Sequence, residues 1–154
     1  PVDLDTFDRT LICQKSAFLC AAKGVNVGIH LQKKLGAGLF GGEGFIMQRL
    51  SGHGKAFVEI DGDLMEYILK PGQSIVVDTG NVAGFEPSVH MDIQQVQGAK
   101  NIFLGGEGIF HTVIHGPGKV YLQSMPLYAT AQALAPYLPT SSGDGINIKL
   151  GGDD

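Results

Sequence analysis

The tetrapeptide Gly41-Gly42-Glu43-Gly44 occurs a second time as Gly105-Gly106-Glu107-Gly108, at an offset of 64 residues. The same offset aligns Gly52-x-Gly54-Lys55 with Gly116-x-Gly118-Lys119. A duplicated backbone has to preserve glycines at turn positions and apolar residues at alternating strand positions, and both are kept here. The sequence therefore predicts two copies of one unit, at about residues 10–73 and 74–127.

Each copy has the pattern of short strands separated by turns. The strands predicted in this way are 56–60, 64–69, 74–77, 82–85, 89–96, 110–114 and 119–124. Asp61-Gly62-Asp63 has the composition of a hairpin turn, so we expect residues 56–60 and 64–69 to pair across it. Strands this short, at turn spacings of roughly 6–10 residues, indicate a β-sandwich or barrel. The expected fold class is all-β, in one domain over residues 1–138.

The end of the chain has a different composition. Residues 126–138 include an alanine-rich run stopped by Pro136, which predicts one short helix. Residues 139–154 are rich in Gly, Ser and Asp and are expected to form a C-terminal tail. Residues 146–150 alternate in polarity, so an added edge strand remains an alternative there.

Composition excludes several classes of protein. Glycine accounts for 23 of 154 residues, about twice the usual share, which favours turns and bulges over helices. The net charge is −4 and only Lys33-Lys34 forms a dense basic spot, so no nucleic-acid partner is expected. No apolar run reaches the roughly 20 residues of a transmembrane helix, so membrane association remains open only without a spanning segment.

The two cysteines, Cys13 and Cys20, have apolar flanks, so both are predicted to be buried. Two cysteines are too few for a disulfide scaffold, which predicts a reducing compartment.

The two Gly-Gly-Glu-Gly tetrapeptides are the candidate site. Glycine-rich loops can bind phosphate at a helix N-terminus, but the residues after each word are strand-like, and neither a Walker loop nor a dinucleotide-binding fingerprint is present. The favoured interpretation is a β-bulge or tight corner, in which Glu43 and Glu107 accept backbone N–H bonds. The candidate structural or ligand-binding residues are Gly41, Gly42, Glu43, Gly44, Gly105, Gly106, Glu107 and Gly108. No catalytic residue is assigned.

The five histidines do not form a local metal-binding pattern. The chain contains no His-x-His, and His111 and His115 are four residues apart in a segment that reads as strand. His53 and His115 lie in the Gly-x-Gly turns, where we expect them to be exposed. No nucleophile elbow is present either. We therefore expect no metal, no cofactor and no enzymatic activity.

Residues 41–52, 69–74, 77–80, 85–89 and, most closely, 105–126 resemble the mitochondrial-biogenesis Aim-type family. The resemblance covers about residues 10–127. It implies a fold like that of the tryptophan RNA-binding attenuation protein, a double-stranded β-helix type of sandwich. It also implies three related units and trimers, with bacterial members largely uncharacterised. Because this chain shows two units, the resemblance further implies that an N-terminal unit is missing. A bacterial member would be cytoplasmic and a eukaryotic one mitochondrial.

These observations lead to two functional hypotheses. The first is a non-enzymatic scaffold or interaction domain that self-associates, with a trimer favoured, or that pairs with the missing N-terminal unit of the same protein. The alternative is a small-ligand or metal-binding β-sandwich, since folds of this kind often hold a site inside the barrel. RNA binding is not carried over from the fold, because fold does not imply function.

Overall fold

The computed structural model describes residues 1–33, 44–95 and 110–138 of the 154-residue chain. In these ranges the chain is mostly β with one C-terminal helical segment, as the sequence predicts. The strands are β1 (Val2–Asp3), β2 (Thr10–Gln14), β3 (Phe18–Ala21), β4 (Val25–Lys33), β5 (Phe45–Gly52), β6 (Lys55–Val58), β7 (Leu64–Leu69), β8 (Ser74–Asp78), β9 (Val82–Phe85), β10 (His90–Gln95), β11 (Phe110–His115) and β12 (Gly118–Gln123). The helix α1 (Leu127–Leu134) continues into the 3-10 turn η4 (Ala135–Tyr137), and three further 3-10 turns are η1 (Leu4–Thr6), η2 (Lys15–Ala17) and η3 (Thr79–Asn81).

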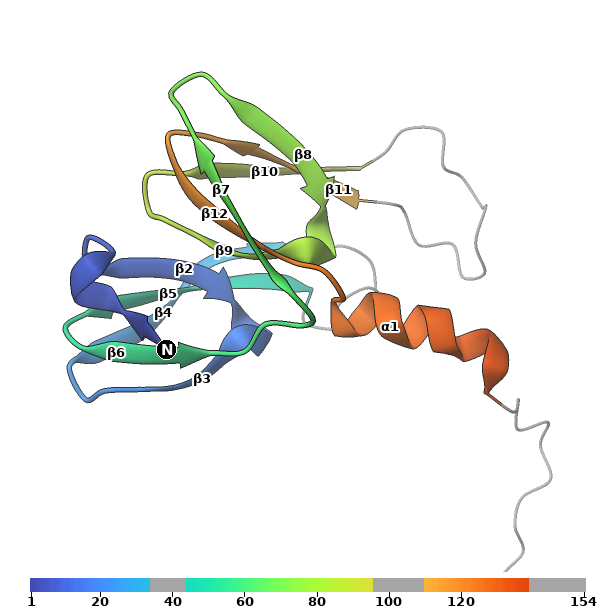
Figure 1. The fold of residues 1–154 in the computed structure, drawn as a ribbon, viewed down its shortest axis with the longest axis horizontal. Coiled ribbons are helices and arrows are strands. Elements are labelled where there is room, and N and C mark those ends of the chain that lie inside the picture. The colour runs from blue at the N-terminus through green and yellow to red at the C-terminus, as the bar shows by residue number, and fades with distance from the viewer. Residues whose placement is uncertain (34–43, 96–109, 139–154) are drawn as a thin grey trace, which may run out of the picture.

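The strands form three antiparallel sheets. The orders are β1-β6-β3, β10-β11-β8 and the six-stranded β4-β5-β2-β9-β12-β7. Figure 1 shows β1–β6, the first half, below β7–β12, the second half, with α1 beside them. The six-stranded sheet is the element that joins the halves, because β2 of the first pairs with β9 of the second.

Strand pairings recur between the halves at the 64-residue offset. Thr10 pairs with Ser51 in β2–β5, and Ser74 pairs with His115 in β8–β11. The pairs β4–β5 and β10–β11 correspond in the same way over their first residues. One register shift interrupts β3–β6 and one interrupts β9–β12. Each half therefore contains one three-stranded sheet and contributes three strands to the six-stranded sheet, with corresponding pairings in the two halves.

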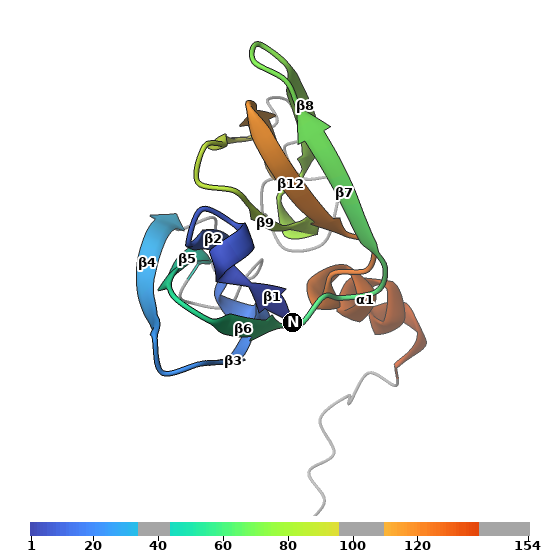
Figure 2. The ribbon, with the colours of Figure 1, turned by 60° about the vertical axis from the view of Figure 1, so that its left-hand side comes forward.

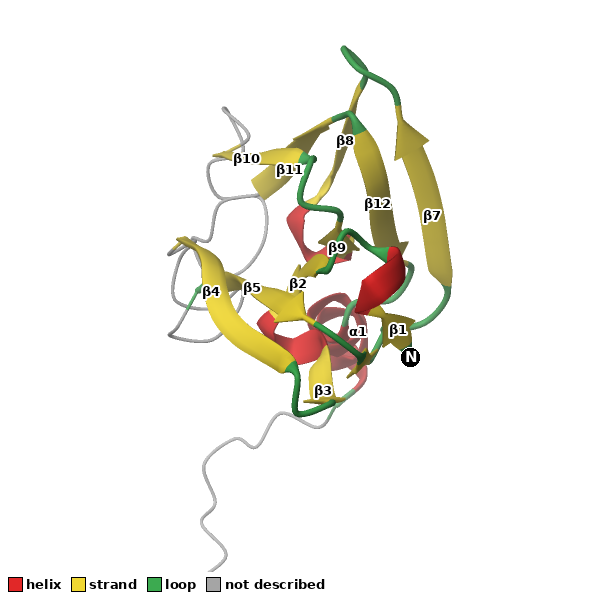
Figure 3. Ribbon diagram, turned by 90° about the vertical axis from the view of Figure 1, so that its left-hand side faces the viewer, coloured by secondary structure: helices red, strands yellow, loops and turns green. Residues whose placement is uncertain are grey.

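The core consists of two apolar clusters. The first includes Ile12, Phe45, Met47, Phe85, Ile114 and Val120, and the second includes Leu4, Leu11, Cys13, Leu50, Ala83 and Tyr121. Because neighbouring strand residues point to opposite faces, Leu11 and Ile12 of β2 enter different clusters. The six-stranded sheet is therefore packed on both faces near the β2–β9 junction, and Figure 3 shows β2 and β9 near its centre.

A buried amide network crosses the same junction. The Nε2 of Gln14 donates to the carbonyls of Gly80 (3.1 Å) and Val82 (2.6 Å). The Nε2 of Gln123 donates to the carbonyl of Gly80 at 3.0 Å, and both glutamine side chains are buried. Because buried carbonyls need donors, Gln14 ties the η3 turn of the second half to β2 of the first, and Gln123 ties the same turn to β12.

The expected hairpin at Asp61-Gly62-Asp63 is wrong. β6 lies between β1 and β3, while β7 pairs with β12, so residues 59–63 pass from one sheet to another. The Asp61 N–H donates to the Gln123 Oε1 at 3.1 Å, and its carboxylate accepts from the Leu127 N–H at 2.8 Å. This aspartate therefore ties the crossover to the start of α1, which lies below the start of β7 in Figure 2.

Most other predicted elements are confirmed within a residue or two. Predicted strands 64–69 and 82–85 coincide with β7 and β9, and the predicted helix lies within 126–138. The tail at 139–154, with its alternating residues 146–150, lies outside the described residues. No helix in the described ranges has the length and apolar character needed to cross a membrane.

Candidate functional site

Most of the Gly-Gly-Glu-Gly residues lie outside the described ranges. This applies to Gly41, Gly42, Glu43, Gly105, Gly106, Glu107 and Gly108. Gly44 is described: it is buried, directly precedes β5 and has a φ of +80°, a backbone conformation that favours glycine. The structural role assigned to these words stays a prediction.

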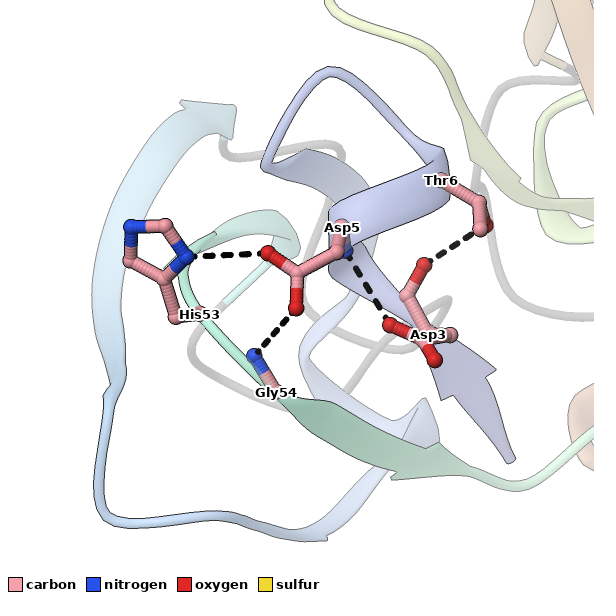
Figure 4. A network of polar contacts seen from close by, with 5 residues as sticks. All are labelled: Asp3, Asp5, Thr6, His53 and Gly54. Carbon is pink, nitrogen blue, oxygen red and sulfur yellow. Dashed lines mark hydrogen bonds and ion pairs between the residues drawn. The ribbon is translucent and has the colours of Figure 1, made fainter.

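The histidine in the first Gly-x-Gly turn makes a surface contact with the N-terminal segment. The Nδ1 of His53 lies 2.9 Å from the Oδ1 of Asp5. Both side chains are exposed, as expected for His53. The other Asp5 oxygen accepts from the Gly54 N–H at 3.3 Å, and Asp3 accepts from the Asp5 N–H at 3.2 Å (Figure 4). This network attaches η1 to the β5–β6 turn. Among the described residues, no group of three or more His, Cys, Asp or Glu side chains is arranged to hold a metal ion.

The cysteines have different environments, although both were predicted to be buried. Cys13 is buried in the second core cluster, and burial raises the pKa of its thiol to about 12. That thiol is therefore a poor nucleophile at neutral pH. The prediction for Cys20 is wrong: this side chain, on β3, is exposed.

A cavity of about 350 Å³ lies between the two halves. The first half contributes the N-terminal segment and β2, and the second contributes parts of β7, β9 and β12. Apolar side chains form most of its wall, including Phe7, Leu11, Ala83 and Tyr121. Asp3 and Glu66 supply carboxylates to the lining. The volume falls within the range of small-molecule sites in proteins, which are mostly apolar with a few polar groups.

Tyr121 is the most distinctive group in the cavity wall. Its side chain is 9% exposed, and its hydroxyl is buried without a hydrogen-bond partner among the described residues. Burial, together with the nearby carboxylates of Glu66 and Glu86, raises the pKa of this hydroxyl. The hydroxyl therefore stays protonated in the physiological range and can donate to an acceptor. The Nζ of Lys119 lies 6.0 Å from the centre of its ring and 3.8 Å from the Glu66 carboxylate.

Sequence reasoning missed this cavity. Its wall combines residues from the N-terminal segment and β2 of one half with residues from β7, β9 and β12 of the other. No local spacing marks that combination, because it depends on how the halves meet. The unpaired hydroxyl of Tyr121 gives no signal either, since an alternating aromatic in a strand reads as core.

The second notable surface is the strand β7, at one edge of the six-stranded sheet. Four of its large apolar side chains are 40–75% exposed: Leu64, Met65, Tyr67 and Ile68. The strand carries no proline, no lysine and no register shift against β12, features that normally protect a free edge from pairing with another chain. Its single charged residue, Glu66, lies 3.8 Å from the Nζ of Lys119. β7 is therefore a mostly apolar free edge with one acidic residue.

The fold and these surfaces define a mostly β protein of three antiparallel sheets, with an apolar cavity and free strand edges. The chain belongs to the family described as mitochondrial biogenesis AIM24, which matches residues 1–125. This agrees with the family that its motifs resemble. An uncharacterised protein of Streptococcus pyogenes serotype M6 is 32% identical over 113 residues, which is 72% of this chain and 44% of that protein.

A solved structure has a similar fold. It is the crystal structure of a Streptococcus pyogenes protein, with a TM-score of 0.66 and 23% identity, covering 84% of this chain and 56% of that one. At this identity the likeness shows the fold alone. The chain spans about half the length of these relatives.

Proposed function

We propose that this chain is a non-enzymatic interaction domain that self-associates through a free strand edge. The observation that carries this proposal is β7, whose apolar side chains are exposed along an edge that no described strand covers. Leu64 and Ile68 project from one face of the strand, and Met65 and Tyr67 from the other. A second copy that adds a strand here would satisfy the edge N–H and C=O groups and bury apolar surface on both faces.

Replacing Ile68 with lysine tests this function. Ile68 is the most exposed of the four, and a charge on an edge strand opposes the addition of another strand. We expect the wild-type chain to show concentration-dependent association in sedimentation analysis, and Ile68→Lys to weaken it by at least about tenfold.

Leu134→Lys is the matched control, because Leu134 is an exposed leucine on α1, away from the sheet edge. It should leave association unchanged. A wild-type chain whose mass is that of a monomer at every concentration would refute the proposed function.

A repeated fold is part of the same proposal. We infer that about residues 10–73 and about residues 74–127 are two copies of one unit. Together they would form a repeated β-sandwich like that of the tryptophan RNA-binding attenuation protein. The recurrence of strand registers at the 64-residue offset supports this inference. The trimer implied by the family resemblance remains a prediction, which the mass of the wild-type assembly decides.

A second candidate function is the binding of a small neutral ligand in the cavity between the halves. The unpaired hydroxyl of Tyr121 favours it, because a buried donor without an acceptor is unfavourable and a ligand oxygen can supply the acceptor. The carboxylates of Asp3 and Glu66 in the lining oppose an anionic ligand. The ligand class is therefore an apolar molecule with a neutral hydroxyl or carbonyl oxygen.

The probes for this second function are 1-octanol and octanoate. We expect 1-octanol to raise the melting temperature in proportion to its occupancy and octanoate to raise it much less. Tyr121→Phe should reduce the effect of 1-octanol, whereas Tyr67→Phe, on the exposed β7, should not. Equal shifts with the alcohol and the carboxylate, or no shift with either, would exclude this site.

A further inference from the structure

Two histidines stand directly opposite each other in the second half of the molecule. His90 begins β10 and His115 ends β11, and the two residues are partners in the antiparallel pairing of these strands, in the upper part of Figure 1. Residues opposed in this way carry their side chains on the same face of the sheet, with Cβ atoms about 4.5–5.5 Å apart. The two imidazole rings accordingly stack, with centres 6.2 Å apart and planes at 28° to each other.

Both imidazoles are accessible to a ligand. The side chains of His90 and His115 are exposed, and neither has a hydrogen-bond or ion-pair partner among the described residues. His53 differs from them, because its Nδ1 already contacts the Asp5 carboxylate at 2.9 Å. A neutral imidazole carries one nitrogen lone pair that can bind a metal ion. The pair therefore offers two such nitrogens from neighbouring strands.

The nearest carboxylate on this face has other partners. Asp92 stands two residues after His90 on β10, so its side chain leaves the sheet on the same face. Its Oδ1 lies 3.6 Å from the Nζ of Lys33, and its Oδ2 accepts from the Nε2 of Gln94 at 3.1 Å. The protein therefore supplies two imidazole ligands and no third one, in keeping with the lack of a three-ligand group among the described residues.

We propose that His90 and His115 together bind one Zn²⁺ or similar divalent transition-metal ion across β10 and β11, with water completing its coordination. Imidazole nitrogens bind Zn²⁺ at about 2.0–2.1 Å, which places two rings on one tetrahedral ion with centres about 5 Å apart. The rings therefore have to approach each other by about 1 Å and turn one nitrogen each toward the ion. Exposed side chains change rotamer readily, so this movement displaces no packed neighbour.

The ion acts as a clamp between two strands. Among the described strands, β10 pairs with β11 alone and ends its sheet. A metal held by one residue of each strand adds a link that the hydrogen-bonded pairing does not supply, and it stabilises the folded chain by its binding free energy. Neither histidine belongs to the wall of the cavity or to β7, so the clamp is separate from both surfaces described above.

Titration of Zn²⁺ into the wild-type chain tests the site, with calorimetry and the NMR signals of the histidine rings as readouts. We expect one ion to bind per chain and the ring signals of His90 and His115 to shift together. The melting temperature should rise with the occupancy of the site. Mg²⁺ should produce none of these effects, because it prefers oxygen ligands to imidazole.

Substitutions identify the two ligands. His90→Gln and His115→Gln should each weaken Zn²⁺ binding at least about tenfold, because the remaining imidazole can no longer chelate the ion. His111→Gln is the matched control, since His111 lies on the same face of β11 but about 13 Å along the strand from His115. It should leave Zn²⁺ binding unchanged. Without metal, all three variants should melt near the wild-type temperature, because surface substitutions of this kind have small effects.

Binding of Zn²⁺ that survives the loss of His90 or of His115 would overturn the inference. An equal loss in His111→Gln would do the same, because it would show that the ion does not distinguish the opposed pair. One ion bound per two chains would place the metal between copies instead of between β10 and β11, and would also contradict the clamp.

Discussion

Replacing Phe85 with alanine is expected to lower the free energy of unfolding by about 3–5 kcal/mol, the usual cost of removing a buried aromatic side chain. Phe85 is 1% exposed and lies on β9, between Ile12 of the first half and Val120 of the second. Its ring belongs to the larger core cluster, which contains residues of both halves. The loss therefore removes transfer energy and leaves a cavity at the point where the halves join.

The measurement is urea denaturation followed by circular dichroism, since the chain contains no tryptophan. Phe57→Ala is the control: Phe57 lies on β6 and is 42% exposed, so its loss should cost much less. A Phe85→Ala variant no less stable than Phe57→Ala would contradict the packing of the junction.

Replacing Gly84 with alanine is expected to cost about 1–3 kcal/mol, as overpacking in a well-packed core does. The added Cβ would lie 2.6 Å from the carbonyl oxygen of Ile12, so β2 and β9 would have to separate. The shift would also strain the bonds of Gln14 to the carbonyls of Gly80 and Val82. We therefore expect the contact between β2 and β9 to loosen before other contacts between the two halves.

Gly28→Ala is the matched control for this substitution. Gly28 lies on β4, and a Cβ built there has nothing within 4 Å. Without a steric cost, this change should be neutral or should stabilise by about 0.4–1 kcal/mol, because alanine restricts the unfolded chain. Both variants are compared by thermal and urea unfolding. Equal stability of the two would show that β9 does not approach β2 as closely as the structure has it.

β7 and β8 both end their sheets among the described residues. β7 lies beside β12 at one edge of the six-stranded sheet, and four of its large apolar side chains are exposed. β8 ends its sheet beside β11, whereas β2 has β5 on one side and β9 on the other.

Local signals in the sequence predicted the elements well. Turn residues and period-two alternation located β7 and β9 to the residue, because such signals depend only on neighbours along the chain. They failed at Asp61-Gly62-Asp63, where a good turn connects two different sheets. A turn motif specifies a reversal of the chain, and which strand lies beside the next one depends on distant partners.

The candidate site was harder to predict from the sequence than the strands were. Of the Gly-Gly-Glu-Gly residues the structure describes Gly44, which has a positive φ, and the role of the tetrapeptides stays a prediction. Cys13 and Cys20 have similar flanks, yet the first is buried and the second exposed. Their difference arises from whether a neighbouring strand covers them, and flanking residues do not carry that information.

The sequence by itself determined that the chain is mostly β, with short strands separated by turns, because turns and alternation are local properties of the backbone. The motifs in residues 41–52, 69–74, 77–80, 85–89 and 105–126 also indicated the family to which it belongs. Tertiary structure alone decided that β2 pairs with β9, that Tyr121 lines a cavity between the halves, and that β8 ends its sheet among the described strands. Those outcomes depend on contacts between residues about 70 positions apart, such as Ile12 and Phe85, which are set by close packing and by the absence of a single Cβ at Gly84.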